Sequence, residues 1–233
     1  MNIEAKRNEF NAKFKKNFRM CVRNRSLLIG SIMILIVVLA AIFADVVAPY
    51  EYDHADMSKK LLMPCKNFLF GTDDFGRDAF SRVIYGSRIA LRVALLAAAI
   101  EIVLGVTIGM LAGYYGGTVD RILSFFADLT WSMPPIIMSM AVITVLGKGL
   151  DNVIIAIAVV SWAQYARVVR VKTQALKNMA FVETAMAFNE SNAAIMLRYI
   201  LPNIVPSIIV LASLSIPATI TSTTALSFLG LGA

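Results

Sequence analysis

Apolar residues occur along this chain in long runs that polar, turn-rich segments separate. The runs cover residues 27–44, 89–112, 122–146, 152–165 and 202–228. A helix needs roughly 20 apolar residues to cross a bilayer, and within lipid it satisfies its own backbone hydrogen bonds. The pattern therefore predicts an all-α polytopic membrane protein with about five transmembrane helices.

The composition supports a membrane chain. Hydrophobic residues make up 58% and charged residues 16% of the 233 positions, whereas soluble domains are about half apolar and a quarter charged. The net charge of +7 does not require a nucleic-acid partner, because basic residues in membrane proteins concentrate in cytoplasmic loops. Cys21 and Cys65 lie on opposite sides of the first apolar run, which argues against a disulfide between them.

Residues 1–26 form a basic segment with Phe10, Phe14 and Phe18 at helical spacing. This pattern predicts an interfacial amphipathic helix, and a basic flank that only orients the first span is an equal alternative. No clean A-x-A cleavage site follows the first run, so we expect an uncleaved anchor. Lys and Arg in the tail, around residues 120–121 and in the stretch 166–200 favour a cytoplasmic N-terminus.

Residues 49–86 should then lie outside the cell, and their centre is a candidate surface for contact with a partner protein. Gly71 and Gly76 allow turns, and Thr72 or Asp73 is predicted to cap a short amphipathic helix. The ligand spacing of an EF-hand is missing, and a lone histidine in a polar loop is more often solvated, so no metal site is expected. The candidate residues at this external face are Gly71, Thr72, Asp73, Gly76, Arg77 and Asp78.

The second and third apolar runs contain features that bear on packing and motion. Small residues recur every four positions around Glu101, which predicts close approach of another helix. A carboxylate inside a span is costly, so Glu101 is expected either to be satisfied by a hydroxyl or arginine of a neighbouring helix or, less favoured, to contact substrate. Residues 134–135 are both proline, which predicts a kink in the third span. The small-residue stripe comprises Ala97, Gly105, Gly109 and Gly113.

The last apolar run is rich in hydroxyl side chains. Such a face suits burial against protein or a water-accessible path better than contact with lipid. We therefore expect a translocation path that includes Glu101 of the second span and a set of hydroxyls from the last one. These are Ser215, Thr219, Ser222 and Thr223.

A charged interval, residues 162–206, separates the last two apolar runs. It predicts a helix continuing to about Lys177, a short helix at 180–188, and a turn at 189–192. On the short helix, a small-residue face around Glu183 is suited to a groove on a soluble partner. The face with Phe181, Ala185 and Phe188 is suited to the protein's own membrane part, and an ordinary connecting loop is the alternative.

This interval resembles the cytoplasmic coupling loop of binding-protein-dependent ABC importer permeases, whose pattern is E-A-A, three residues, G, nine residues, I-x-L-P. Glu183, Thr184 and Ala185 correspond to E-A-A and Asn189 to G. Tyr199, Leu201 and Pro202 correspond to I, L and P. The departures are Thr184, Asn189 and Tyr199, and asparagine still tolerates a left-handed turn. The resemblance implies that residues 166–201 receive force from an ATPase, with Ala187 and Phe188 among the contacting residues.

Other stretches resemble the dipeptide, oligopeptide and nickel permeases in particular. They are FGTDDFGRDAFSRVIYGSRIAL, AGYYGGTVDRILSFFADL, WAQYARVVRVKTQALK, RYILPNIVP and ALSFLGLG. The resemblance implies a permease bundle over residues 27–233. The family usually has six spans, the last after the L-G-L-G turn, so we expect a chain truncated at its C-terminus.

The resemblance also implies partners and a place in the cell. These are a second homologous permease, two cytoplasmic ATPase subunits that hold ATP and Mg, an external substrate-binding protein, and the inner membrane. The chain itself is expected to be a peptide permease subunit without catalytic residues or cofactors, and nickel or another small solute is the alternative cargo. A membrane-embedded enzyme using Glu101 and Asp128 lacks HExxH or paired-Asp signatures. A non-transporting scaffold is a further alternative.

Overall fold

The computed structural model describes residues 24–232 and divides the chain into two compact units, Met1–Leu91 and Arg92–Ala233. The described residues form helices, with one isolated β-bridge between Thr72 and Asp78. Four helices are long and apolar enough to cross a membrane, or five if a sharply bent pair counts as one span. The all-α polytopic class is therefore confirmed. The amphipathic helix predicted within residues 1–26 lies outside the described residues, apart from the last three.

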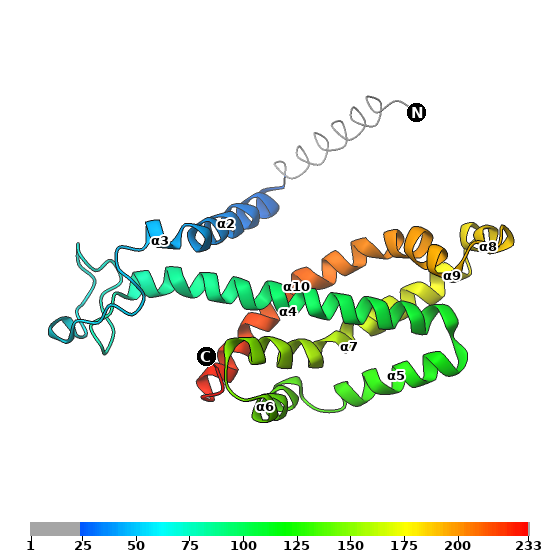
Figure 1. Ribbon diagram of the computed structural model, residues 1–233. Helices are drawn as coiled ribbons and strands as arrows, with labels where there is room; N and C mark the ends of the chain where they lie inside the picture. Colours follow the sequence, from blue (N-terminus) through cyan, green and yellow to red (C-terminus); the bar gives the residue numbers. More distant parts are fainter. Residues whose placement is uncertain (1–23, 233) are drawn as a thin grey trace. The chain divides into compact units, whose positions relative to one another are not determined.

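In the first unit, α2 (Arg25–Ile42) confirms the first predicted span, and the short α3 (Ala44–Val47) follows it (Figure 1). The Asn24 side chain accepts a hydrogen bond from the Leu27 amide and caps α2. At the other end, the Arg88 guanidinium donates to the carbonyls of Ala41 and Ile42 and pairs with Asp45 at 3.0 Å. Arg88 thus satisfies carbonyls that the end of a helix leaves without partners.

Helix α4 (Ala79–Tyr115) is continuous, so the short amphipathic helix and the second span predicted as separate elements are one helix. Its cap also differs from the prediction. The Asp78 carboxylate accepts from the Ser81 amide at 2.7 Å and from its hydroxyl at 2.6 Å. Asp78, rather than Thr72 or Asp73, therefore occupies the capping position, because it is the acidic side chain directly before the first turn.

In the second unit, the small-residue stripe of α4 packs against α7 (Leu150–Lys177), as predicted. A Cβ at Gly105 would lie 2.3 Å from the Tyr165 Cβ, and one at Gly109 would lie 2.5 Å from the Ala166 carbonyl oxygen. Only a residue without a side chain permits this approach of two backbones.

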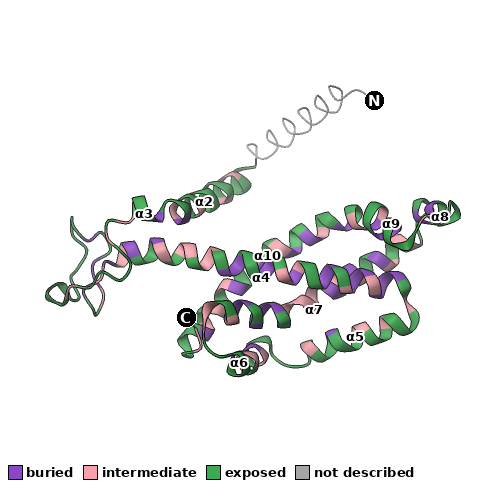
Figure 2. Ribbon diagram, viewed as in Figure 1, coloured by how far each residue is buried: buried purple, intermediate pink, exposed green. Residues whose placement is uncertain are grey.

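Helix α7 is the central element of this unit, because it also contacts α5 (Gly117–Trp131), α6 (Pro135–Leu146) and α10 (Leu201–Phe228). Its buried residues are conspicuous in Figure 2. A core cluster joins α7 to α4 and to the helices that follow it. Its members include Val106, Met110, Tyr165, Val169, Val182, Ile195, Ile200 and Ile204.

The predicted kink in the third span is a sharp break. Helices α5 and α6 meet at 91°, with Pro134 and Pro135 at the junction. Residues 120–121, expected in a loop, lie in the first turn of α5. The following hairpin is confirmed by positive φ at Gly147 (89°) and Gly149 (145°). Helix α10 confirms the predicted last span, including its start near Pro202.

Candidate coupling and translocation sites

The charged interval folds as predicted: α7 ends at Lys177, and α8 (Ala180–Ala187) follows after a two-residue break. Of the face expected to hold α8 to the bundle, only Ala185 is confirmed. Val182 and Ala185 are buried in the core cluster, whereas Phe181 and Phe188 are exposed, Phe188 by 80%. Smaller residues are buried here because they let the α8 backbone lie close to its neighbour, the segment Ile195–Ile200.

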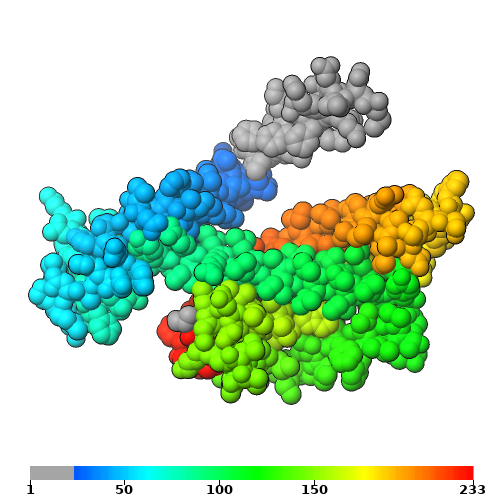
Figure 3. All heavy atoms as spheres, viewed as in Figure 1, coloured from blue at the N-terminus to red at the C-terminus, as the bar shows by residue number. Residues whose placement is uncertain are grey.

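The opposite side of α8 is open. Glu183, Thr184, Ala187, Phe188 and Asn189 are exposed, and of the six predicted coupling residues only Ala185 is buried. The Thr184 hydroxyl donates to the Ala180 carbonyl of its own helix at 2.7 Å. Figure 3 displays this gold-coloured segment uncovered on the face in view. A partner can therefore contact the Glu183 carboxylate, the Phe188 ring, the small side chains of Thr184 and Ala187, and the turn at Asn189.

The three departures from the coupling pattern fit this loop without disturbing it. Asn189 adopts the left-handed conformation (φ 57°) that the corresponding glycine would take, as predicted. Ser191 caps the next turn, because its hydroxyl accepts from the Ala194 amide at 3.3 Å. The Tyr199 phenol donates to the Glu190 carboxylate at 2.8 Å, so the tyrosine ties the turn to the helix that leaves it.

Between α8 and α10 lie α9 (Asn192–Ala194) and a π-helical segment, η2 (Ile195–Ile200), which carries most of the contacts with α8. Tyr114, near the end of α4, adds polar links to this region. Its phenol donates to the Asn192 side chain at 2.8 Å, and its carbonyl accepts from the Lys177 ammonium at 2.7 Å. The base of α8 is thus joined to α4, α7 and α10 together.

A second site lies deeper in the same unit. Glu101 of α4 and three predicted hydroxyls of α10, those of Ser215, Thr219 and Ser222, line one cavity of about 210 Å³. The structure does not place Thr223 among the lining residues; its hydroxyl donates to the Thr219 carbonyl within α10. Sequence reasoning missed two polar lining residues, Ser161 and Gln164 of α7. The sequence did contain a signal for them: two polar residues three positions apart in an apolar span lie on the same helix face.

Glu101 lacks the neighbouring partner that we expected. The residue is fully buried, and neither carboxylate oxygen has a hydrogen-bond partner among the described residues. The nearby hydroxyls are otherwise engaged: Tyr165 and Ser215 bond each other at 2.6 Å, and Ser215 also donates to the Ala212 carbonyl. The prediction of an internally satisfied glutamate was therefore wrong.

Other carboxylates of this unit are paired across helices. Asp120 of α5 receives the Arg170 guanidinium and the Gln174 amide of α7, and the Ser124 hydroxyl. Asp128 pairs with Arg167 at 2.8 Å. Asp128 lines a different cavity from Glu101, so the structure does not bring together the two carboxylates that a membrane-embedded enzyme would have used.

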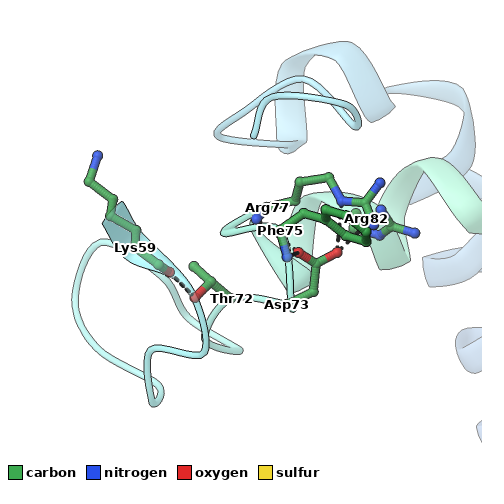
Figure 4. Close-up of polar contacts among 6 residues, drawn as sticks. All are labelled: Lys59, Thr72, Asp73, Phe75, Arg77 and Arg82. Atoms are coloured by element: carbon green, nitrogen blue, oxygen red, sulfur yellow. Dashed lines mark hydrogen bonds and ion pairs between the residues drawn. The ribbon is translucent and has the colours of Figure 1, made fainter. Parts of the chain in front are cut away.

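The segment between α3 and α4 forms an ordered polar loop, part of which is drawn in Figure 4. Gly71 and Gly76 have positive φ, and a Cβ at Gly76 would lie 1.8 Å from the Asp56 carbonyl oxygen, which confirms both as turn residues. The Thr72 hydroxyl donates to the Lys59 carbonyl and accepts from the Leu62 amide at 2.8 Å.

Asp73 organises the other half of this loop. Its carboxylate accepts from the Phe75 amide at 2.8 Å and from the amide and guanidinium of Arg77, and it pairs with Arg82 at 3.4 Å. Partial burial alone would raise the pKa of Asp73. The backbone and side-chain hydrogen bonds outweigh that effect and hold the pKa below its ordinary value of 3.8. Asp73 therefore stabilises the loop as an anion.

Two family models match this chain. Residues 105–233 match the family model of the binding-protein-dependent transport system inner membrane component. Residues 14–64 match the N-terminal transmembrane domain of oligopeptide transport permease C.

Curated relatives are similar over most of the chain. The dipeptide transport system permease protein DppC of Alkalihalophilus pseudofirmus is 37% identical over 94% of this chain and 72% of its own length. The oligopeptide transport system permease protein OppC of Bacillus subtilis is 35% identical over 90% and 68%. The glutathione transport system permease protein GsiD of Escherichia coli O157:H7 is 38% identical over 94% and 72%.

The chain belongs to the family of binding-protein-dependent transport system inner membrane components. It is a multi-pass inner-membrane permease subunit of an ABC importer. Family membership also implies that it works with an ATPase and a substrate-binding protein.

Proposed function

We propose that this permease subunit forms half of a translocation path for dipeptides or oligopeptides. The named cargoes of its relatives, a dipeptide, an oligopeptide and the tripeptide glutathione, support a peptide cargo. The other half of the path belongs to a second, homologous permease. Two cytoplasmic ATPase subunits bind ATP and Mg, and this chain has no cofactor and no catalytic residue of its own.

The observation that carries the coupling mechanism is the two-sided environment of α8. Val182 and Ala185 anchor the helix in the core, while Glu183, Thr184 and Asn189 face outward. An ATPase that binds the outward side displaces α8. The core cluster and the Tyr114 hydrogen bonds transmit the displacement to α4, α7 and α10 as one body. A densely packed core transmits such motion because it has little free volume to absorb it.

This mechanism requires α8 in the cytoplasm. The ends of α4 and α7 that meet at Tyr114 and Lys177 then also face the cytoplasm, and the N-terminus lies on the same side. The charge bias of the tail and the coupling loop supports this orientation. In the same orientation the loop around Asp73 is external, and the half-buried Asp73 and Arg77 are available to the binding protein or the partner permease. The other predicted contact residues, Gly71, Thr72, Gly76 and Asp78, are buried and shape the loop instead.

Charge reversal on α8 tests the coupling mechanism. Glu183→Arg should leave membrane insertion intact and lower peptide uptake at least about tenfold, since like-charge placement at an interface costs several kcal/mol. The matched control is Glu51→Arg, the same change at an exposed glutamate of the outer segment. Co-purification with the ATPase and uptake of a labelled dipeptide into proteoliposomes are measured for both. Unchanged binding and uptake in Glu183→Arg contradict the mechanism.

The cargo is tested in the same proteoliposomes. A dipeptide, an oligopeptide, glutathione and nickel ion are offered to the complete transporter, and stimulation of ATP hydrolysis is recorded for each. Stimulation by peptides supports the proposal. Stimulation by nickel alone would replace the peptide cargo with the metal, and the role of α8 would be unaffected.

A further inference from the structure

The cavity around Glu101 has the features of a built binding site. It has about 210 Å³ of space, whereas a single water molecule requires roughly 10–15 Å³. Five helices of the second unit contribute to its wall: α4, α5, α6, α7 and α10. Its polar groups come from different elements and converge on one space, as expected for a ligand site. They are Glu101, Ser161, Gln164, Ser215, Thr219 and Ser222.

The carboxylate in this cavity is fully buried and unpartnered. Both Glu101 oxygens are inaccessible, and neither accepts a hydrogen bond in the described part of the chain. An isolated carboxylate in an apolar medium is strongly disfavoured, and a carboxylate within a span marks a partner or a path by default. The missing partner must therefore come from outside the described residues or be a proton.

Three arginines of the same helices are engaged elsewhere. Arg167 pairs with Asp128, Arg170 with Asp120, and Arg92 with Asp151 at 3.5 Å. Each of these arginines belongs to α4 or α7, the two helices that meet beside Glu101. The fold thus neutralises the neighbouring aspartates internally and leaves this one glutamate facing a cavity.

The group that best complements this wall is a protonated amine. An ammonium carries three donors and a positive charge, so it can give one hydrogen bond to the Glu101 carboxylate and others to hydroxyl or amide oxygens of Ser161, Gln164 or Ser222. A substrate in transit must bind and then leave. Burying both charges offsets much of their attraction, so such a site releases its ligand readily.

We propose that the cavity lined by Glu101 binds a protonated amine of the transported substrate. The inference rests on the proposed peptide cargo, since a peptide supplies an amine at its N-terminus or on a lysine side chain. Glu101 accepts the amine, and the hydroxyls and amide of α7 and α10 complete its coordination. Substrates that carry such a cation are preferred at this step over acylated analogues of the same size.

A labelling experiment tests binding in the unaltered protein. Dicyclohexylcarbodiimide, an apolar reagent that modifies carboxyl groups in membranes, is applied to the assembled complex in detergent, and modification of Glu101 is followed by mass spectrometry. Millimolar glycylglycine should slow the modification at least about threefold if the site is mostly occupied. N-acetylglycylglycine should not. N-acetyl-glycyl-lysine, whose cation is on its side chain, should protect if a lysine amine also fits.

Uptake by variants provides the second readout. Glu101→Gln keeps the size and removes the charge, and it should lower glycylglycine uptake at least about tenfold, as expected when one member of a buried charge pair is lost. Glu101→Asp should restore part of the rate. Glu51→Gln, the same change at an exposed position, should retain the wild-type rate.

The outcomes separate the two proposals. If the wild-type complex transports no peptide, the proposed function fails. If it transports glycylglycine, yet glycylglycine leaves the labelling of Glu101 unchanged and Glu101→Gln behaves like Glu51→Gln, only the amine site is overturned. Equal protection by glycylglycine and its N-acetylated analogue also overturns it, because the site would then not recognise the charge.

Discussion

Glu101 and Asp120 are both carboxylates of the second unit beside α7, but their surroundings are opposite. The Asp120 carboxylate accepts two hydrogen bonds from the Arg170 guanidinium, one from the Gln174 amide and one from the Ser124 hydroxyl. Glu101 receives no hydrogen bond in the described structure and faces a cavity. The first carboxylate fastens α5 to α7, whereas the second remains available to a group that residues 24–232 do not supply.

This difference indicates which charges maintain the bundle and which serve transport. A saturated ion pair between helices stabilises their arrangement, and its removal is felt mainly in folding. An unpartnered buried carboxylate lowers stability, and proteins retain such groups where function requires them. Removing the Asp120 carboxylate should therefore lower the stability of the folded protein, whereas removing the Glu101 carboxylate should raise it.

The largest effect is expected from Gly105→Ala, which disturbs the packing that both sites share. The new Cβ would meet the Tyr165 Cβ at 2.3 Å and the Trp162 carbonyl oxygen at 2.7 Å, so α4 and α7 must separate. Such overpacking costs about 3 kcal/mol at the upper end of its usual range. The matched control is Gly86→Ala, where nothing lies within 4 Å and the change should stabilise by about 0.5–1 kcal/mol. The thermal unfolding midpoint in detergent reports both, and equal midpoints would refute the close packing.

Asp120→Ala should come next, with a destabilisation of about 2 kcal/mol, because it leaves Arg170 and Gln174 without their acceptor. This is less than the full cost of breaking a buried ion pair, because the Asp120 and Arg170 side chains are 15% and 32% exposed. Tryptophan fluorescence follows unfolding, as Trp131 and Trp162 lie on α5 and α7. Substitution of the exposed Asp74 by alanine serves as the control, and a midpoint equal to that control would show that the pair contributes nothing.

Glu101→Met should have the opposite sign. Replacing the unpartnered carboxylate by an apolar side chain of similar length removes a desolvation penalty of about 1 kcal/mol or more and raises the unfolding midpoint. Peptide uptake should fall in the same variant. A lowered midpoint would mean that Glu101 has a stabilising partner, and the contrast with Asp120 would then disappear.

The smallest effect concerns Asp73 and acid. Its pKa is lower in the folded loop than in the unfolded chain, so it stabilises the loop above about pH 4 and loses this contribution as the pH falls through the folded value. The expected loss is about 1 kcal/mol or less, as for exposed ion pairs. Limited proteolysis of the outer segment between pH 5 and pH 3 measures it. Asp73→Asn should flatten the dependence; an unaltered profile in that variant would assign the acid response to other groups.

Several local features were predictable because they depend on short stretches of chain. The boundaries of α8 follow from the helix formers between Asn178 and Asn189, and the left-handed Asn189 follows from its resemblance to a glycine position. The tight stripe of Gly105, Gly109 and Gly113 also predicted close packing correctly. The identity of the partner helix, α7, required the structure.

Other features were predicted wrongly because distant parts of the chain decide them. The buried side of α8 is set by the shape of η2 and α7, which favours Val182 and Ala185 over Phe181 and Phe188. The partner expected for Glu101 is missing among the described residues, and two hydroxyls of its surroundings, those of Tyr165 and Ser215, bond each other instead.

The sequence by itself determined the membrane class, the helical spans and the coupling segment, because hydrophobic length, glycine spacing and capping residues act over a few turns of chain. The sequence also predicted that Glu101 shares a path with hydroxyls of the last span. Only the tertiary structure decided which groups meet in one cavity: Ser215, Thr219 and Ser222 do, Thr223 does not, and Ser161 and Gln164 of α7 join them. Such a meeting depends on how closely α4 and α7 approach and on where α10 returns. A buried carboxylate acquires its role from that three-dimensional arrangement, since its solvation and partners are set by neighbours that no local pattern records.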